Sequence, residues 1–173
     1  MEQLVIHGGA GSLEGKTTEA QKMHDSLCKI WEETFEVLQK RSAEDAVRYA
    51  VRMLEDDPVY NAGTGSKLQA DGQIRMSAAL MDGTNNRFSG VINVQNIRNP
   101  IEAAALLSGE KHSILSSAQA TEFCRTKGIP EYNPETEFRL HEYKSNCAGI
   151  HGTVGAVALD KDGHIFAGTS TGG

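Results

Sequence analysis

His151-Gly152-Thr153-Val154-Gly155-Ala156-Val157-Ala158-Leu159-Asp160 is the stretch of sequence that decides the fold. After its threonine the residues are small, β-branched or aliphatic, and no charge appears before Asp160. This composition is typical of a strand buried on both faces of a sheet. A glycine directly precedes the hydroxyl residue, and glycine adopts backbone angles that other residues avoid. The stretch therefore predicts a buried strand whose start can be bent sharply beside a reactive hydroxyl.

A second hydroxyl-rich segment, Thr169-Ser170-Thr171-Gly172-Gly173, follows at a distance that suits the other strand of a hairpin. The residues between the two, Lys161-Asp162-Gly163-His164, contain Asp-Gly, a strong signal for a tight turn. Pairing of the strands would bring a second group of hydroxyls close to Thr153. Two interpretations of Thr153 follow: it is only the first residue of a buried strand, or it is a nucleophile.

The nucleophile interpretation has a simple chemical basis. A threonine hydroxyl reacts poorly at neutral pH unless a base lies within hydrogen-bonding distance. Within a chain the nitrogen of Thr153 is an amide and cannot accept a proton. Once the bond before it is cut, that nitrogen becomes an α-amine with a pKa of roughly 7.7–8. The β-methyl group also restricts rotation of the side chain, which helps to hold the hydroxyl in place.

Together, His151–Asp160 and Thr169–Gly173 resemble the processing site of the plant-type asparaginase and isoaspartyl peptidase family. Members are N-terminal-nucleophile hydrolases, made as one chain that cuts itself before a threonine. The resemblance implies that the bond between Gly152 and Thr153 is cut, that Thr153 is the nucleophile and that Thr171 supports it. By proximity, Thr169 or Ser170 could also support it. It also implies hydrolysis of side-chain amide bonds: asparagine to aspartate plus ammonia, and isoaspartyl dipeptides.

Other functions remain open on the sequence alone. A glycosylasparaginase or a threonine endopeptidase of the same family would carry the same residues, although the absence of a secretion signal and of paired cysteines counts against a lysosomal glycosylasparaginase. A non-catalytic fragment that binds a partner or awaits its other half is the alternative from another class.

Near the N-terminus, a short apolar strand ends in His7-Gly8-Gly9-Ala10-Gly11. A phosphate-binding loop is disfavoured because no Lys-Ser/Thr follows the glycines. An oxyanion loop of the lipase type is disfavoured because the chain has no Gly-x-Ser-x-Gly elbow. The third interpretation, which we prefer, is the start of the resembled family, where this strand lies next to the active site. His7 itself is interpreted as a packed residue at a strand end.

The segment Leu54-Glu55-Asp56-Asp57-Pro58-Val59-Tyr60-Asn61-Ala62-Gly63-Thr64-Gly65 ends a helix and enters a loop. By itself it could be an ordinary solvated turn. In the resembled family it is a sodium-binding loop, whose asparagine reaches toward the nucleophile. The resemblance therefore implies that Asn61 lies by Thr153 and that a structural sodium ion is bound by backbone oxygens, a donor type that suits a hard cation. The implied carbonyl ligands are those of Leu54, Glu55, Asp57, Tyr60, Ala62 and Thr64.

Hydrophobic periodicity and turn signals predict helices and strands in a layered α/β protein. The resemblance implies the four-layer αββα sandwich of N-terminal-nucleophile hydrolases, incomplete in this chain. One position departs from the family pattern, because Ser77 stands where many members have aspartate. The helices are expected at 17–40, from Ser42 to about Leu54, at 100–107 and at 113–127, and the strands at 3–7, 66–70, 73–81, 88–94, 153–159 and 164–169.

The domain interpretation follows the cleavage site. Residues 1–152 correspond to an α-subunit region, of which 129–152 lack periodicity and are expected to be a mobile linker, or alternatively a tether between domains. Residues 153–173 correspond to the truncated start of a β-subunit region. The resemblance implies that the β-subunit remainder carries an Arg and an Asp that hold the substrate and a Thr-Gly pair that forms the oxyanion hole. We therefore expect this chain alone to be inactive, and the complete protein to form an (αβ)2 homo-oligomer.

Composition limits the remaining classes of function. The chain has 173 residues, 39% of them hydrophobic, and a net charge of −6. The acidic balance and the lack of a basic run argue against a nucleic-acid surface. No apolar stretch is long enough to span a bilayer, and the N-terminus does not read as a signal peptide. The three cysteines are odd in number and form no CxxC, which favours a reduced, cytoplasmic setting. Chemistry of the proposed kind requires no cofactor.

Overall fold

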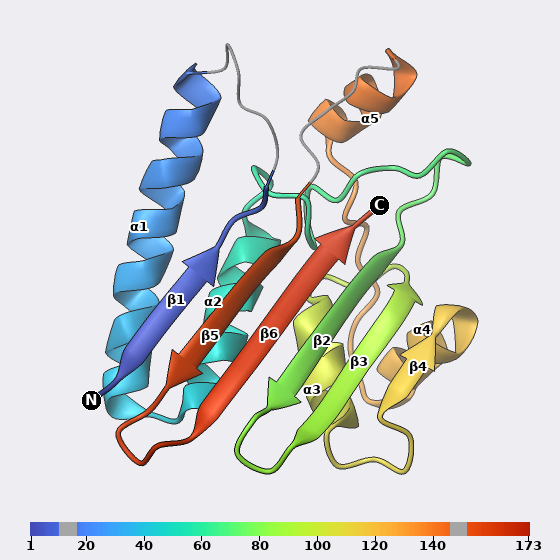
Figure 1. Ribbon diagram of the computed structural model, residues 1–173. Coiled ribbons are helices and arrows are strands. Elements are labelled where there is room, and N and C mark those ends of the chain that lie inside the picture. Colours follow the sequence, from blue (N-terminus) through green and yellow to red (C-terminus); the bar gives the residue numbers. More distant parts are fainter. Residues whose placement is uncertain (11–16, 146–151) are drawn as a thin grey trace.

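A single six-stranded sheet organises the chain in the computed structural model, which describes residues 1–10, 17–145 and 152–173 (Figure 1). The strands lie in the order β1-β5-β6-β2-β3-β4. All neighbours are antiparallel except β3 and β4, which are parallel. In chain order the elements are β1 (Gln3–His7), α1 (Thr17–Lys40), α2 (Ala43–Asp56), β2 (Met76–Asp82), β3 (Arg87–Val94), α3 (Pro100–Leu107), β4 (Ile114–Ser116), α4 (Ser117–Thr126), α5 (Glu137–Lys144), β5 (Val154–Leu159) and β6 (Ile165–Gly172).

The hairpin predicted from the opening stretch forms as β5 and β6. Its register pairs Val154 with Ser170 and Leu159 with Ile165. β1 pairs with the other edge of β5, and β2 pairs with the other edge of β6. The two hydroxyl-rich segments therefore occupy adjacent strands in the middle of the sheet.

Helices cover one face of the sheet (Figure 1). α2 packs on β5 and β6, α3 packs on β2 and β3, and α1 packs on α2 and on β1. The core between the layers includes fully buried aliphatic side chains from α2 and the strands, among them Val47, Val51, Leu54, Met76 and Val91. This part of the fold is an α/β two-layer arrangement.

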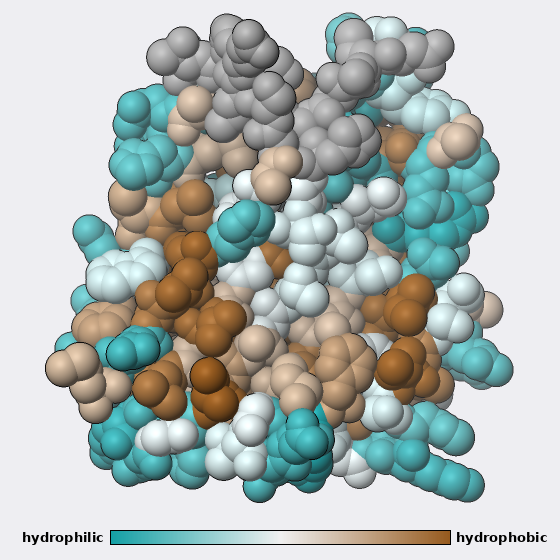
Figure 2. Space-filling view, in the orientation of Figure 1, coloured by the Kyte–Doolittle hydropathy of each residue, from teal (hydrophilic) through white to brown (hydrophobic). Residues whose placement is uncertain are grey.

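The other face of the sheet is turned to the viewer in Figure 1, and no helix of the described residues covers it. Large apolar side chains are exposed on it, including Val5 (66%), Phe88 (47%), Ile92, Ile114 and Val157. Figure 2 shows these side chains as hydrophobic patches over the strands. The prediction that β5 is buried on both faces is therefore wrong for this chain, because Val157 remains 42% exposed. A mixed α and β fold with one layer of helices on one sheet is half of the predicted four-layer sandwich.

Most of the predicted helices form where local chemistry defines their ends. α1 spans the predicted residues, and α2 begins after Ser42, whose hydroxyl accepts the N–H of Asp45 while donating to the Asp45 carboxylate. α3 begins at Pro100, at a position where the missing N–H of proline has no helical partner to lose. These boundaries confirm the capping signals in the sequence.

Three expectations for secondary structure are wrong. Residues 66–70 do not form a strand, although Asp71-Gly72 does form a turn in which Gln69 N–H donates to Gln73 O (2.9 Å). The segment before α4 forms the short strand β4 instead of the first turn of a helix. The region 129–152, which lacks periodicity, contains α5.

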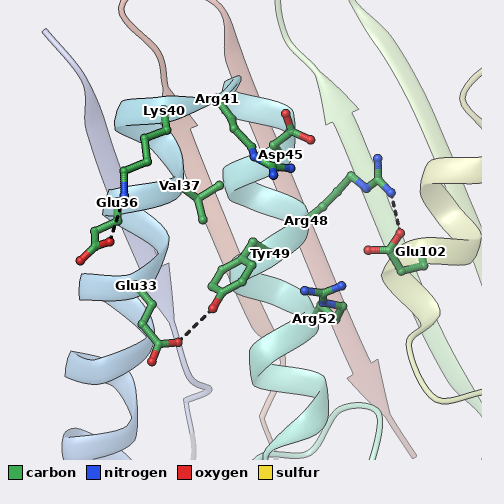
Figure 3. Close-up of a pocket in the computed structure, with 10 residues that line it drawn as sticks. All are labelled: Glu33, Glu36, Val37, Lys40, Arg41, Asp45, Arg48, Tyr49, Arg52 and Glu102. Carbon is green, nitrogen blue, oxygen red and sulfur yellow. Dashed lines mark hydrogen bonds and ion pairs between the residues drawn. The ribbon is translucent and has the colours of Figure 1, made fainter.

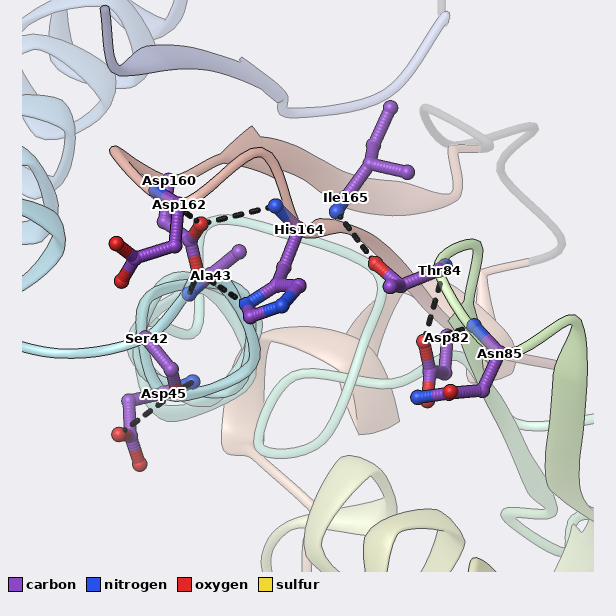
Figure 4. A network of polar contacts seen from close by, with 10 residues as sticks. All are labelled: Ser42, Ala43, Asp45, Asp82, Thr84, Asn85, Asp160, Asp162, His164 and Ile165. Carbon is purple, nitrogen blue, oxygen red and sulfur yellow. Dashed lines mark hydrogen bonds and ion pairs between the residues drawn. The ribbon is translucent and has the colours of Figure 1, made fainter.

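Two buried carboxylates, Asp160 and Asp82, fix the turns that follow β5 and β2 (Figure 4). Asp160 accepts backbone N–H groups from Ala43 (3.2 Å), Asp162 (3.0 Å) and His164 (2.9 Å), and thus ties the β5–β6 turn to the start of α2. Asp82 accepts N–H groups in the β2–β3 turn. Burial raises the pKa of Asp160, but its hydrogen bonds outweigh burial and leave that pKa below its usual value.

Candidate active site

Thr153 lies immediately before β5, at the edge of a hollow on the open face of the sheet. The hollow has a volume of about 280 Å³, and its walls are mostly apolar. Hydroxyl groups from Thr153, Thr169, Thr171 and Ser77 line one part of it. The side chain of Thr153 is exposed in this chain, yet it faces a defined hollow and not a flat surface.

Strand register explains why these hydroxyls gather. Ser77 pairs with Thr171 across β2 and β6, and Val154 pairs with Ser170 across β6 and β5. One residue further along, Thr153 lies opposite Thr171. Since directly opposed residues point to the same face of a sheet, the side chains of Thr153, Thr171 and Ser77 form a row across three strands. The sequence prediction that the two segments bring hydroxyls together is confirmed for Thr153 and Thr171.

Hydrogen bonds fix two of the hydroxyls that line the hollow. The Thr169 hydroxyl donates to Val154 O (3.0 Å), which holds β6 against the start of β5. The Ser77 hydroxyl accepts the N–H of Asn93 (3.1 Å). Within the described residues, no hydrogen bond engages the hydroxyls of Thr153 or Thr171.

The N-terminal glycine segment lies against the predicted cleavage site. A Cβ added to Gly152 would lie 2.9 Å from Gly9 Cα, and a Cβ added to Gly9 would lie 3.1 Å from Gly152 Cα. Gly9 also has a φ of 116°, a backbone conformation that favours glycine. The ring of His7 places Nδ1 3.1 Å from Thr153 O. This contact agrees with our preferred interpretation of the glycine segment as a strand end beside the site for His7 to Ala10, whereas Gly11 lies outside the described residues.

Asn61 reaches the same end of the sheet but contacts other groups than Thr153. Its Nδ2 donates to Gly172 O (2.6 Å), and its Oδ1 accepts the N–H of Lys67 (2.9 Å). Asn61 is buried, with 7% of its surface exposed. The residue therefore holds the end of β6, on which Thr171 precedes Gly172, and its predicted approach to Thr153 remains a prediction.

The segment predicted to bind sodium, residues 54–65, curls tightly around the C-terminal end of α2. Thr64 N–H donates to Glu55 O (2.8 Å), and a Cβ added to Gly63 would lie only 2.4 Å from that same oxygen. Gly63 has a φ of 52°, so only glycine fits there without strain. Leu54 O lacks the usual helical partner, because residue 58 is a proline without an N–H group.

The predicted ligands suit sodium by donor type, since backbone carbonyl oxygens are donors that a hard cation takes. The six predicted ligands, Leu54, Glu55, Asp57, Tyr60, Ala62 and Thr64, all belong to this curled segment. Among the described residues, no group of three or more His, Cys, Asp or Glu side chains is arranged to hold a metal ion. A cation here would thus be held by backbone and not by side chains.

The side chain of Glu55 lies in the core, although its backbone belongs to the segment of residues 54–65. Its Oε1 accepts the N–H of Ile101 (3.0 Å) at the start of α3, and the residue is fully buried. Burial raises the pKa of this carboxyl to about 8, since the hydrogen bond from Ile101 offsets only part of the effect. Glu55 is therefore mostly a neutral acid at pH 7. The role expected from sequence concerned its backbone oxygen only.

Arg139 on α5 is a residue of this region that sequence reasoning missed. Only 3% of its surface is exposed, and its guanidinium donates to Gly65 O (2.6 Å) and to Glu142 Oε2 (2.9 Å). In the sequence it stands between Phe138 and Leu140 in a segment rich in charged residues, and an exposed arginine is the normal expectation. The pair at 139 and 142 has helical spacing, which could have indicated α5 but not the burial.

Another hollow, of about 600 Å³, lies on the outer side of the helices between α1, α2 and α3 (Figure 3). Its charged side chains largely satisfy one another: Arg48 pairs with Glu102 (2.6 Å), and Tyr49 donates to Glu33 (3.0 Å). Four acidic and four basic residues line it, so it carries no net charge to select a ligand. It has no contact with the hydroxyl row on the opposite face of the sheet.

Comparison with known proteins agrees with this geometry. A profile described as asparaginase matches residues 1–149. The isoaspartyl peptidase/L-asparaginase of Synechocystis sp. is 44% identical over 99% of this chain and 58% of its own length, and that of Nostoc sp. is 44% identical over 99% of this chain and 61% of its own. The plant-type L-asparaginase of Pyrococcus horikoshii is 35% identical over the whole chain and 64% of its own length.

The chain thus spans about three fifths of the length of these relatives. None of its described helices has the length and apolar composition to cross a membrane. The profile match covers most of the chain, and the relatives align along nearly all of it. This chain belongs to the asparaginase family, a family of hydrolases with the N-terminal-nucleophile fold.

Proposed function

We propose that the protein is a self-processing amidohydrolase that converts asparagine to aspartate and ammonia and also hydrolyses isoaspartyl dipeptides. The relatives in Synechocystis and Nostoc carry both activities in their names. The observation that carries the proposal is the position of Thr153 at the start of β5, opposite Thr171 and on the rim of a hollow. Its preceding residue, Gly152, packs against Gly9 at the end of β1.

Processing would begin with the Thr153 hydroxyl. Its oxygen attacks the carbonyl carbon of Gly152, and the acyl group moves from the Thr153 nitrogen to the oxygen. Water then hydrolyses this ester, which leaves a carboxylate on Gly152 and a free amine on Thr153. That amine has a pKa near working pH and becomes the general base.

Turnover repeats the same chemistry on the substrate. The Thr153 amine takes the hydroxyl proton while the oxygen attacks the side-chain amide carbon, and a tetrahedral oxyanion forms. Collapse expels ammonia, or the amine of the following residue, with the proton held by the Thr153 amine, and leaves an aspartyl ester on Thr153. Water activated by the same amine hydrolyses the ester and releases aspartate. Thr171 lies on the next strand, where its hydroxyl would hydrogen-bond to the nucleophile.

The chain alone is proposed to be inactive. The part of the relatives that this chain does not span would supply the β-subunit remainder, with the groups that hold the substrate and the oxyanion. The exposed apolar face of the sheet, which includes Val5, Phe88 and Ile114, supports this, because a second sheet packed on it would remove those side chains from water and complete the four layers. An (αβ)2 assembly and a cytoplasmic, reducing location remain part of this proposal.

We also propose that sodium, when bound by the carbonyls of residues 54–64, fixes the shape of the loop. The ion would be bound by the partial negative charge of these carbonyl oxygens and would take no part in the chemistry. Asn61 lies in this loop and holds β6, so the loop would act on the site through that strand. A glycosylasparaginase or endopeptidase of the same family remains the alternative, and no contact in the described residues favours it.

The experiment uses a precursor that joins this chain to the part its relatives have beyond it. Release of aspartate would be measured with asparagine and with a β-aspartyl dipeptide. We expect both to be hydrolysed, and Thr153→Ala to lower the rate by more than about 10³-fold because the nucleophile is lost. Undiminished aspartate release from Thr153→Ala would exclude this mechanism, and hydrolysis of neither substrate by a correctly processed protein would exclude the substrate class.

A further inference from the structure

We propose that Arg139 is a positioning residue that holds the loop of residues 60–65 in the shape that keeps Asn61 on the end of β6. The proposal concerns a side chain on α5, in the segment whose sequence predicted only a linker. Its structural part stands without the proposed function, and only its consequence for catalysis rests on that function.

The first step is the geometry of the Arg139 guanidinium. Nε donates to Gly65 O (2.6 Å), Nη2 lies 3.5 Å from Tyr60 O, and Nη1 donates to Glu142 Oε2 (2.9 Å). One planar group thus binds both ends of the loop and a carboxylate on its own helix. The fixed fork of arginine suits this task, whereas a lysine ammonium cannot serve three separated acceptors in the same way.

The second step is the burial of Arg139 and Glu142, which makes the loss of these hydrogen bonds costly. Arg139 is 3% exposed, and the side chain of Glu142 is 13% exposed. A buried guanidinium is stable only when its charge and N–H groups are paired. The carbonyls of Gly65 and Tyr60 would in turn lose a buried donor if Arg139 were removed, so the loss would fall on the loop and not only on α5.

The third step is that the neighbourhood of Arg139 holds the same loop at other points. Gly65 N–H donates to Pro134 O (3.2 Å), and the hydroxyls of Thr64 and Tyr132 lie 2.9 Å apart. The segment from Tyr132 to Arg139 therefore runs along the loop and is bonded to it repeatedly. α5 ends this bonded segment, and the Thr136 hydroxyl accepts the N–H of Arg139 at the start of the helix.

The fourth step connects the loop to the site. Asn61 follows Tyr60 directly and bonds to both the N–H and the C=O of Gly172, through its own backbone oxygen (3.0 Å) and its Nδ2 (2.6 Å). Gly172 follows Thr171. Without the Arg139 hydrogen bonds to Tyr60 O and Gly65 O, the loop would hold Asn61 less firmly. The end of β6 would then lose its hydrogen-bond partner. Thr171 would then be less precisely placed opposite Thr153.

The structural test is hydrogen–deuterium exchange on the chain as it stands. Arg139→Gln removes the charge and the fork, while Glu137→Gln is the matched control, because it removes an exposed charge from the same helix and leaves the guanidinium and all its partners in place. We expect Arg139→Gln to speed exchange by about tenfold or more in peptides that contain Lys67 and Gly172, whose amides donate to Asn61. Peptides of β2 and β3 should exchange as in the wild type.

Glu137→Gln should change exchange at Lys67 and Gly172 by less than about threefold. A folded Arg139→Gln variant with wild-type exchange in both peptides would overturn the proposal, and so would an equal effect from Glu137→Gln. If Arg139→Gln does not fold, Arg139→Lys carries the same test, because it keeps a cation for Glu142 but not the fork: wild-type exchange at both amides would again overturn it.

The catalytic consequence has its own measurement in the processed precursor. We expect Arg139→Gln to lower kcat by about five- to twentyfold while KM changes less than about twofold, because Thr171 and not the substrate pocket is displaced. Arg139→Lys should recover part of kcat. A precursor with no amidase activity would refute the proposed function, whereas the exchange experiment would still decide the role of Arg139. An active Arg139→Gln enzyme with unchanged kcat would confine Arg139 to a purely structural role and refute the catalytic part.

Discussion

Asn61 and Gly172 are joined by two hydrogen bonds, although 111 positions separate them: Asn61 Nδ2 donates to Gly172 O (2.6 Å), and Gly172 N–H donates to Asn61 O (3.0 Å). A Cβ added to Gly172 would lie 2.1 Å from the Ser66 hydroxyl oxygen, so the loop and strand lie in close contact here. The pairing connects the loop after α2 to the strand that carries Thr171. Several measurable properties follow from such fixed contacts.

Asn61→Ala should destabilise the chain by about 1–3 kcal/mol, because it leaves Gly172 O and Lys67 N–H buried without partners. Urea denaturation measures this free energy. Asn133→Ala is the control, since Asn133 is exposed and accepts one local bond from Glu135 N–H; it should cost less than about 1 kcal/mol. Equal effects of the two substitutions would show that the Asn61 amide contributes nothing beyond an ordinary turn contact.

Gly63→Ala should destabilise the chain by more than Gly128→Ala. Both glycines have positive φ, 52° and 81°, so both substitutions strain the backbone by about 1–2 kcal/mol. At Gly63 the new Cβ would also lie 2.4 Å from Glu55 O, whereas at Gly128 nothing lies within 4 Å. Thermal melting of the two variants measures the difference, and a Gly63→Ala chain as stable as Gly128→Ala would contradict the tight loop around α2.

Asp160→Asn should cost about 1.5–3 kcal/mol at pH 7, because the ionised carboxylate accepts three backbone N–H groups. Since the pKa of Asp160 is lowered in the folded chain, its ionisation stabilises the fold above the unfolded pKa, and this contribution is lost as pH falls through the folded pKa. The difference between wild type and Asp160→Asn should therefore shrink below about pH 4. Asp162→Asn, an exposed carboxylate in the same turn, is the control, and a difference independent of pH would contradict the role of ionisation.

Glu55→Gln tests a carboxyl whose pKa is raised in the folded chain, whereas that of Asp160 is lowered. Burial raises the pKa of Glu55 to about 8, so between the ordinary glutamate pKa of 4.5 and about 8 the folded chain holds a proton that the unfolded chain has lost. Stability from Glu55 is thus present at low pH and declines across this window. Across this pH window the free energy of unfolding of Glu55→Gln, relative to that of the wild type, should rise by about 1.4 kcal/mol per pH unit. Denaturation at several pH values measures it. A difference that stays flat from pH 5 to 8 would show that Glu55 is ionised in the fold.

The elements that the sequence predicted well are those with local causes. α2 and α3 begin at Ser42 and Pro100, where a capping hydroxyl and a proline act within one turn. The β5–β6 hairpin forms around Asp162-Gly163 because the turn signal lies between two apolar segments. In each case the deciding residues are close neighbours in the chain.

The elements that were missed depend on distant partners. β4 has three residues and exists by pairing with β3, and α5 is anchored by Arg139 to Gly65, 74 positions away. Residues 66–70 carry strand-like signals, yet Lys67 N–H bonds to the side chain of Asn61 and not to a neighbouring strand. For the site, the proximity of Thr153 and Thr171 could be predicted from the spacing of their two segments around the Asp-Gly turn. The hydrogen-bond partners of Asn61 could not be predicted, because they depend on the conformation of the loop after α2.

The central claim is that Thr153 becomes an N-terminal nucleophile by cleavage of the bond before it. Intact-mass spectrometry of the purified precursor, made as wild type and as Thr153→Ala, tests this directly. The account predicts two wild-type fragments, the second beginning with Thr153, and a single uncut mass for Thr153→Ala. Cleavage after Gly152 in Thr153→Ala, or an active wild-type protein that remains one uncut chain, would contradict it.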